Sequence, residues 1–346
     1  MTSQTERPTV RATAIDRERI VEGLQAALQA KDEAVRLGQE LAPQIDRIYF
    51  VGCGAPNRVM LTLEYWMDQA HTTFQVKRYF PAEFMTIEPL LDERTLVVLG
   101  SKSGTTLETV QAAEYLKDKP CLTLAVTSTP EAPLARAVQR ALFLGDTEQA
   151  HTGIYIVLQA LVGSLLHARD GWPLLQPLLR SLDALPAVLV ESAELNDRRA
   201  REDARTYQDD QILYLLASGP MFATAYVFGV CMLMEMQWLH SMPVEAAEWF
   251  HGPFEILDAQ TPVMLLLGED PSRPLMERAA AFCQKYTSRV MLYDTRDYPM
   301  TGVDPEIRPI VGPFVLQAAL NRFAEHLSEL HNHHLDTRRY MWVTEY

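Results

Sequence analysis

The chain has 346 residues, 48% of them hydrophobic and 22% charged, which is enough for two ordinary domains and gives no compositional sign of disorder. Its 31 Lys and Arg residues face 45 Asp and Glu residues, for a formal net charge of −14. This balance disfavours non-specific attraction to nucleic acid or to an anionic membrane. A phosphate group would therefore need a local binding site.

Neither the cysteines nor the apolar segments indicate a metal site or a membrane protein. The four cysteines lie far apart in mostly apolar surroundings, without a CxxC pair, and are predicted to be reduced core thiols. The first twenty residues carry charges throughout and lack the apolar stretch of a signal peptide. No uninterrupted apolar run reaches the length of a membrane span, so we expect a cytoplasmic protein.

In the first half of the chain, predicted strands alternate with predicted helices. An amphipathic pattern over 16–41 predicts one helix that stops before Pro43. Three apolar runs, each followed by a small-residue loop and a helical pattern, come next: RIYFVGCG at 47–54, LVVLGSKSGTT at 96–106 and CLTLAVTSTP at 121–130. Such alternation predicts a parallel sheet of the doubly wound type.

The second half repeats this pattern. QILYLLASGPMF resembles RIYFVGCGAPNR, PVMLLLGEDPSR resembles LVVLGSKSGTTL, and RVMLYDTRDYP resembles LTLAVTSTPEAP. A long helix (153–171) and a Leu- and Pro-rich connector (172–186) are expected to separate the halves, with a boundary near 191–201. We therefore expect two flavodoxin-like α/β domains in tandem: residues 1–195 with an N-terminal helix, and residues 196–346 with a C-terminal tail.

The segment SKSGTTLET is the candidate phosphate site. Ser101, Ser103, Thr105 and Thr106 supply hydroxyl groups between a strand and a helix N-terminus, where the helix dipole and unpaired N–H groups favour an anion. A turn that only caps the helix is the alternative. The second half has GEDPSR at the same place, so only the first half keeps a convincing phosphate site.

Two neighbouring loops are weaker candidates. GCGAPN contains Gly52 and Gly54, which allow close approach of the backbone to a substrate, but it lacks the GxGxxG pattern and the acidic partner of a dinucleotide site. VTSTPEAPLA places Ser128 at the same edge of the sheet if the strands are parallel, although Ser or Thr before Pro also begins ordinary helices.

Glu235 is predicted to lie in an α-helix whose neighbouring positions are apolar. A carboxylate in such a place costs several kcal/mol to bury unless it is paired or neutral. Desolvation would raise the pKa of Glu235 toward the range useful to a general base. A structural ion pair with an arginine that joins two helices is the alternative.

The segment EAAEWFHGPFE follows, with Glu248 and His251 beside a Gly-Pro turn that could aim side chains into a cleft. Histidine is the side chain suited to acid catalysis near neutral pH. The sequence has no GxSxG, HExxH or EF-hand pattern, so we expect neither serine nor metal-assisted hydrolysis, and no metal or organic cofactor.

The segments FVGCG, GSKSGTT, TSTPEAPLA and EAAEWFHGPFEI together resemble the motifs of sugar isomerase (SIS) domain proteins, which include the isomerase half of glucosamine-6-phosphate synthase. Within that superfamily, MEMQWLHS, AEWFHGPFEILD and DTRRYMWVTEY look most like the fructosamine-6-phosphate deglycases. The resemblance implies two SIS-type domains and a cofactor-independent enzyme.

The resemblance also implies roles for individual residues. In such deglycases the Glu of the MEMQW-type helix and the His of the FHGP-type turn are the base and acid, which here are Glu235 and His251. In amino-sugar isomerases the Glu before the HGP turn is the base, so Glu248 stays a rival. The tail, where the synthase has a lysine, has Arg338 and Arg339 instead, and we count Arg339 among the substrate-binding candidates.

The expected activity is cleavage of a 6-phosphorylated Amadori compound to glucose 6-phosphate and a free amine. The identity of the amine stays open, because relatives often show SGE where this chain has Ala246, Ala247 and Glu248. A sugar-phosphate sensor and an aldose-ketose or amino-sugar isomerase are the alternatives. A homodimer with a shared active site is expected from the superfamily.

Overall fold

The structure is a computed structural model that describes residues 9–345. The chain forms two compact units. The N-terminal unit contains residues 16–188 and 300–311, and the C-terminal unit contains 189–299 with the described parts of 1–15 and 312–346. Residues 1–8, which belong to the stretch expected to lack a signal peptide, lie outside the described residues.

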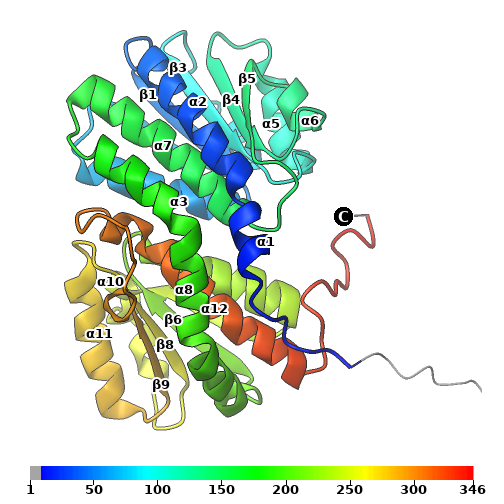
Figure 1. Ribbon diagram of the computed structural model, residues 1–346, viewed down its shortest axis with the longest axis vertical. Helices are drawn as coiled ribbons and strands as arrows, with labels where there is room; N and C mark the ends of the chain where they lie inside the picture. The colour runs from blue at the N-terminus through cyan, green and yellow to red at the C-terminus, as the bar shows by residue number, and fades with distance from the viewer. Residues whose placement is uncertain (1–8, 346) are drawn as a thin grey trace, which may run out of the picture. The chain divides into compact units, whose positions relative to one another are not determined.

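The N-terminal unit is built on a five-stranded parallel sheet in the order β2-β1-β3-β4-β5 (Figure 1). Its strands are β1 (Arg47–Gly52), β2 (Gln75–Tyr79), β3 (Thr95–Gly100), β4 (Leu122–Thr127) and β5 (Arg140–Phe143). Its helices are α1 (Arg17–Glu22), α2 (Gln25–Leu41), α3 (Gly54–Gln69), α4 (Pro81–Ile87), α5 (Leu107–Leu116), α6 (Pro133–Arg136) and α7 (Ala150–Asp170).

Alternate strand residues supply two cores in this unit. Val51, Val97, Leu99 and Ala125 pack with α4, α5 and α6, where Phe84 is fully buried. Neighbouring strand residues such as Phe50 are also fully buried, because α2, α3 and α7 cover the other face (Figure 1). Burial on both faces explains why the central strands β1, β3 and β4 are mostly apolar, whereas the edge strands β2 and β5 are partly exposed.

The single helix predicted over 16–41 is divided into α1 and α2. Gly23 ends α1, and its carbonyl accepts a hydrogen bond from Thr147 Oγ1 at 2.5 Å. Asp16 caps the start of α1 by accepting from the Arg19 amide at 3.0 Å. The amphipathic period continues across the break, and for this reason the pattern did not reveal it.

The C-terminal unit has a four-stranded parallel sheet in the order β7-β6-β8-β9. Its strands are β6 (Ile212–Ala217), β7 (His240–Glu245), β8 (Val263–Leu267) and β9 (Val290–Asp294). Its helices include α9 (Met221–Tyr226), the π-helix η1 (Val227–Met236), α10 (Ala246–Trp249), α11 (Arg273–Tyr286) and two short 3-10 helices, η2 (Pro253–Ile256) and η3 (Thr295–Asp297). α10 and α11 cover one face, around the fully buried Trp249.

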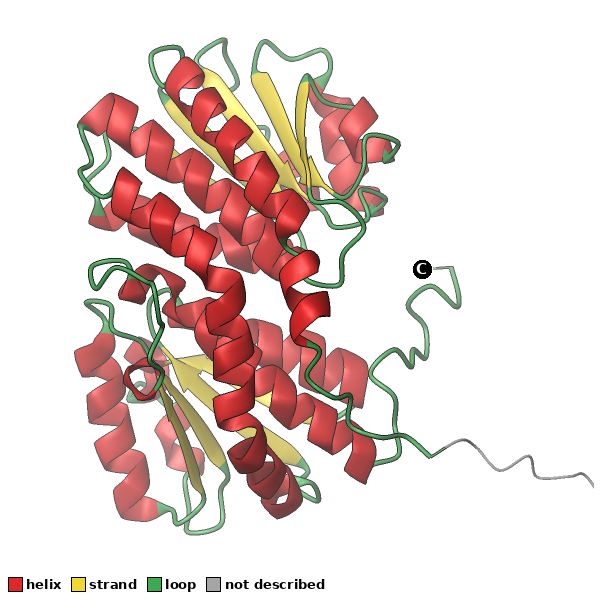
Figure 2. Ribbon diagram, viewed as in Figure 1, coloured by secondary structure: helices red, strands yellow, loops and turns green. Residues whose placement is uncertain are grey.

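The two sheets share one topology. The strand order 2-1-3-4 of the first sheet recurs as 7-6-8-9 in the second, and the repeated segments of the sequence correspond to β1 and β6, β3 and β8, and β4 and β9. Figure 2 shows both sheets with helices packed on them. The expected fold class of two doubly wound, parallel-sheet α/β domains is confirmed.

The connector predicted at 172–186 is instead largely helical. α8 runs from Leu175 to Tyr207 with Pro186 inside it, and α12 runs from Arg308 to Leu330 with Pro313 inside it. A proline removes one helical hydrogen bond, but buried leucines on α8, including Leu178, Leu182 and Leu185, provide packing that retains the helix. Residue 195 lies within α8, and a domain boundary there stays a prediction.

α7 is the one described helix that is long and apolar enough to cross a membrane. An 18-residue window of it has a mean hydropathy of 1.3, and 89% of that window is buried within the protein. A core helix that packs on α2 and α3 satisfies the same test of length and composition. Its C-terminus is capped by Gly171 in the left-handed conformation (φ 70°).

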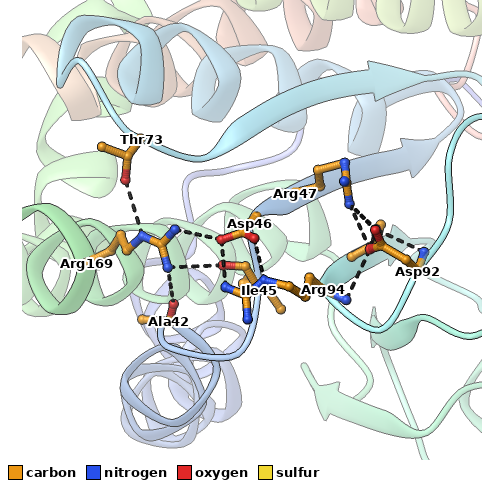
Figure 3. A network of polar contacts seen from close by, with 9 residues as sticks. Ala42, Ile45, Asp46, Arg47, Thr73, Asp92, Arg94 and Arg169 are labelled. Carbon is orange, nitrogen blue, oxygen red and sulfur yellow. Dashed lines mark hydrogen bonds and ion pairs between the residues drawn. The ribbon is translucent and has the colours of Figure 1, made fainter.

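An ionic network joins three parts of the N-terminal unit at the amino end of its sheet (Figure 3). Asp46, between α2 and β1, accepts hydrogen bonds from Arg94 before β3 and from Arg169 in the last turn of α7, the latter at 2.7 Å. Arg169 also donates to the carbonyls of Ala42 and Ile45. The guanidinium groups of Arg94 and Arg169 hold the pKa of Asp46 well below its usual range.

We predict that Asp46→Asn lowers the melting temperature at pH 7. A carboxyl whose pKa is depressed in the folded protein contributes stability that is present at neutral pH and is lost as the pH falls through the folded pKa. The difference between Asp46→Asn and the unchanged protein should therefore shrink in acid and in high salt. Melting curves from pH 2 to pH 7 measure this difference in melting temperature, with a substitution of an exposed residue, Asp118→Asn, as control. A melting temperature of Asp46→Asn that is lower by the same amount at every pH would contradict the prediction.

Candidate functional site

The hydroxyl-rich loop lies between β3 and α5, at the carboxyl end of the first sheet. The buried Ser101 holds it together, because its Oγ lies 2.9 Å from Thr106 Oγ1 and accepts from the Gly104 amide at 3.1 Å. Ser103 and Thr105 are exposed, and Ser103 Oγ accepts from Thr105 Oγ1 at 2.8 Å. The loop thus has an internal member, Ser101, and an outward-facing pair.

The β3 loop packs closely against the β4 loop. Gly104 has φ +63°, and a Cβ on it would come within 2.6 Å of both Ala132 Cβ and Thr127 Oγ1. Ser128 Oγ donates to the carbonyl of Lys102 at 2.6 Å. The structure therefore brings Ser128 together with the loop 101–106, as expected for parallel neighbouring strands.

The glycine loop after β1 lies at the same edge. Gly52 is buried and pairs in register with Gly100, while Gly54 is exposed at the start of α3 with φ +54°. Asn57, which the sequence motifs did not single out, is fully buried and donates to the carbonyls of Gly52 and Tyr79 at 2.9 and 3.1 Å. Its place in the first turn of the predicted helix could have drawn attention to it.

The corresponding edge of the second sheet is occupied by carboxylates of the protein itself. Glu245 at the end of β7 accepts from the amides of Gly219 and Ala247, at 3.3 and 2.5 Å. Asp270 in the β8 loop accepts from Ser272 N at 3.0 Å and Ser272 Oγ at 2.6 Å. These acidic groups occupy N–H donors that an anion would need, and their charge would repel a phosphate.

Glu235 lies near the end of η1, which is a π-helix and not the predicted α-helix. A π-helix has more residues per turn than an α-helix, so α-helical spacing does not give the direction of the Glu235 side chain. Gly229 lets η1 approach β7 closely, because a Cβ there would lie 2.9 Å from Pro243 Cγ. Ser241 Oγ donates to the Gly229 carbonyl at 2.8 Å.

The Glu235 carboxylate forms an ion pair with Arg338 of the C-terminal tail, residues 331–345. Arg338 Nη2 lies 3.0 Å from Glu235 Oε1, and the side chains of Arg338 and Glu235 are 8% and 27% exposed. Burial raises the pKa of Glu235 above its ordinary value, and the positive charge of Arg338 opposes that rise. The arginine partner considered for Glu235 therefore exists, but it comes from the tail and not from a second helix.

A cavity of about 690 Å³ opens beside this ion pair. Its walls come from the end of η1, the start of β7 and the tail, and consist of Met234, Glu235, Trp238, Leu239, His240, Arg338, Arg339, Tyr340 and Met341. The volume lies in the range typical of small-molecule sites. The predicted binding residue Arg339 is thus in the same cavity as Glu235.

Trp238 is the surface on which the tail docks. It has a left-handed backbone (φ +56°), which is uncommon for a bulky residue, and it is 40% exposed. The Arg339 guanidinium lies 4.2 Å from its ring centre, and the His333 ring lies 4.4 Å from it. Gln237 Nε2 also donates to the His333 carbonyl at 3.1 Å.

The HGP turn is anchored by aromatic residues on either side. Phe250 and Phe254 flank His251 and pack against Phe282 of α11, with ring centres 5.4 and 5.6 Å from it. The side chains of Glu248 and His251 are exposed, and the backbone joins the two residues through a hydrogen bond from the His251 amide to the Glu248 carbonyl at 2.9 Å. Within the described residues, no hydrogen bond or ion pair joins Glu235 to either of them.

Within residues 9–345, no group of three or more His, Cys, Asp or Glu side chains is arranged to hold a metal ion. Asp46, Glu245 and the other paired carboxylates described above are engaged with arginines or backbone amides. The polar and aromatic groups available at the cavity are a carboxylate, two arginines, a histidine, a tyrosine and an indole ring.

Comparisons with known proteins agree with this architecture. Residues 41–166 match the SIS domain family. The fructosamine deglycase FrlB of Bacillus subtilis is 36% identical over 93% of this chain and 99% of its own length. The agropine synthesis conjugase of Rhizobium rhizogenes is 32% identical over 88% of each chain, and the fructoselysine 6-phosphate deglycase of Escherichia coli is 29% identical over 86% of this chain and 85% of its own.

A crystal structure from Bacillus subtilis, described as that of a phosphosugar isomerase, superimposes with a TM-score of 0.86. It is 36% identical in sequence and covers 92% of this chain and 99% of its own. Similarity of sequence and fold over nearly the whole chain confirms the resemblance to the deglycases within the SIS superfamily. This chain belongs to the family of SIS-domain proteins that includes the fructosamine deglycase of Bacillus subtilis.

Proposed function

We propose that this protein is a fructosamine-6-phosphate deglycase, which cleaves a 6-phosphorylated Amadori compound to glucose 6-phosphate and a free amine. The observation that carries the proposal is the 36% identity to a fructosamine deglycase along almost the entire length of both chains. A cavity with a half-buried carboxylate, and a separate loop rich in hydroxyl groups, supply chemistry that this reaction needs.

The reaction would start from open-chain 1-amino-1-deoxyfructose 6-phosphate. A base removes a proton from C1, the C1–C2 double bond forms, and the C2 oxygen takes up a proton to give an enaminol. Protonation of C2 then moves the double bond to C1 and nitrogen, which gives the imine of glucose 6-phosphate. Water adds to C1 and the amine leaves, so the substrate and one water yield glucose 6-phosphate and the amine.

We assign Glu235 as the base and His251 as the acid that acts at the C2 side, with Glu248 as the rival base. Ser101, Ser103, Thr105, Thr106 and Ser128 would bind the phosphate, with Gly52 and Gly54 allowing close approach and Arg339 contacting the substrate. A bound phosphate would anchor the substrate, because binding energy remote from the reacting carbon positions that carbon for attack.

The remaining assignments also rest on the resemblance. We propose a hydrolase of the cytoplasm that needs no metal or organic cofactor. We further propose a homodimer in which both copies contribute to each active site, and tandem SIS domains at 1–195 and 196–346. Small phosphorylated sugar-amines would be its substrates.

Incubation of the purified protein with fructoselysine 6-phosphate should release glucose 6-phosphate and lysine. The sugar phosphate can be followed with glucose-6-phosphate dehydrogenase, and the amino acid by chromatography. An isomerised sugar phosphate without amine release would indicate the isomerase alternative. Binding without any turnover, over a panel of Amadori 6-phosphates, would indicate a sensor and would overturn the proposal.

The conjugase relative raises a second candidate, the same steps run in reverse. Its name describes a joining reaction, and it is 32% identical over 88% of this chain. Every step of the deglycase mechanism is reversible, since none consumes an energy-rich compound. Incubation with glucose 6-phosphate and an excess of amine, at the same enzyme concentration, tests this direction directly.

We predict that Glu235→Gln retains the fold but lowers kcat by ~10²-fold or more, because a positioned proton acceptor contributes roughly that factor. Glu248→Gln should stay close to the unchanged protein. The two variants are matched, since each replaces one carboxylate by a nearly isosteric amide. Measurement of kcat and melting temperature on both decides between the candidate bases, and an inactive Glu248→Gln with an active Glu235→Gln would reverse our assignment.

A further prediction concerns the loop 101–106. Ser103→Ala should raise KM by roughly tenfold or more without affecting the fold, because a hydrogen bond to an ionised partner contributes about 1.5–3 kcal/mol. Gly104→Ala should act more severely, since no room exists for its Cβ. The exposed Ser288→Ala serves as control. An unchanged KM in Ser103→Ala, together with unchanged competition by inorganic phosphate, would remove the loop from the binding site.

A further inference from the structure

Arg338 is the most buried charge at the cavity, and both terminal nitrogens of its guanidinium have polar partners. Nη2 contacts Glu235, while Nη1 donates to the carbonyls of Leu335 and Thr337 at 2.7 and 3.1 Å. Nε is buried without a hydrogen-bond partner among the described residues. Glu235 is the one acidic side chain within ion-pairing distance of Arg338 in the described chain.

Each member of this pair depends on the other. A buried cation without a partner is strongly destabilised, and so is a buried carboxylate. The lower exposure of Arg338 means that water cannot easily replace the carboxylate as its partner. Because η1 carries Glu235 and the tail carries Arg338, the two segments are held together by this mutual requirement.

We propose that Arg338 is a positioning residue, which holds the carboxylate of Glu235 in one orientation and in its ionised form, so that docking of the C-terminal tail completes the base. The inference rests on the proposed role of Glu235. It assigns to the tail a function beyond covering the cavity.

Other groups around Glu235 cannot supply the same effect. The titratable or charged side chains that share the cavity walls are His240 from β7 and Arg339 and Tyr340 from the tail. The Arg339 guanidinium lies over the Trp238 ring, and the His333 ring also packs against this indole. Only burial and Arg338 alter the pKa of Glu235 appreciably, and they act in opposite directions.

Different residues of the tail therefore dock it on Trp238 and form the ion pair with Glu235. His333 and Arg339 dock on Trp238, and Arg338 reaches Glu235. Arg338 and Arg339 are adjacent and carry the same charge, yet among the described ion pairs only Arg338 meets a carboxylate. This gives a matched pair of variants, Arg338→Gln and Arg339→Gln, that remove one positive charge each from neighbouring places.

The first test is the pH dependence of kcat/KM for fructoselysine 6-phosphate. The acidic limb reports the free enzyme's base. In Arg338→Gln, no positive charge opposes the rise in the pKa of Glu235 that burial causes, so the acidic limb should move to higher pH. Arg338→Lys should return the limb to its position in the unchanged protein. Arg339→Gln should leave the position of the limb unchanged, whatever its KM. A loss in Arg338→Gln by the same factor at every pH would overturn the proposal and indicate a structural or substrate-binding role.

The second test needs no substrate, and so separates a failure of this inference from a failure of the proposed function. A carboxyl whose pKa is raised on folding costs stability as the pH rises through the folded pKa. From pH 5 to pH 8 the melting temperature of Arg338→Gln should fall more than that of the unchanged protein. Adding Glu235→Gln to Arg338→Gln should abolish this extra fall. Equal slopes in the unchanged protein and Arg338→Gln would refute control of the Glu235 charge by Arg338.

Discussion

Backbone N–H groups at the carboxyl edge of a parallel sheet need acceptors, and the two units meet this need differently. In the N-terminal unit, neutral hydroxyls of Ser101 and Ser103 accept from the loop amides. In the C-terminal unit, Glu245 and Asp270 do so with full negative charges. A duplicated topology thus leaves one edge compatible with an anionic ligand and one edge that already contains its anions. This asymmetry explains why only one of two similar sheets is a candidate for phosphate.

The same electrostatic requirement governs Glu235. A carboxylate withdrawn from water must be paired, neutralised or expelled, and here a guanidinium from the tail pairs with it. The surroundings of that pair are largely apolar or aromatic, with Met234, Trp238 and Leu239 in the cavity wall. A low-dielectric wall strengthens the attraction between the two charges while keeping the carboxylate basic. Reactivity and stability at this place are therefore not independent properties.

Six of the strands could be predicted from the sequence, because β1, β3, β4, β6, β8 and β9 are short, mostly apolar runs followed by small or hydroxyl residues. The repeat of three such runs also predicted that the two halves share a topology. Three strands at sheet edges, β2, β5 and β7, contain polar residues and were not predicted. The break at Gly23 and the helical connector containing Pro186 could not be predicted, since both depend on tertiary partners, Thr147 for the former and the leucine packing of α8 for the latter. Such tertiary contacts cannot be inferred from the local hydrophobic pattern of a segment.

For the candidate site, the sequence identified Glu235 from its apolar surroundings but not its partner, because Arg338 lies far along the chain in a segment without periodic pattern. The proximity of Ser128 to the loop 101–106 was predictable, since neighbouring parallel strands place their following loops side by side. Glu248 at the end of α10 and His251 in the following turn are both exposed, so burial does not distinguish one from the other.

The π-helix η1 has a consequence for how this site tolerates change. Successive residues of an α-helix are separated by about 100° around the axis, so the direction of a side chain depends on how many residues precede it. A wider helix accommodates extra residues without lengthening the element much, and η1 does so immediately before Glu235. The direction in which the Glu235 side chain points therefore depends on the number of residues in η1 that precede it. Insertions and deletions within 227–235 would redirect it even where every retained amino acid is the same, whereas many substitutions there would not.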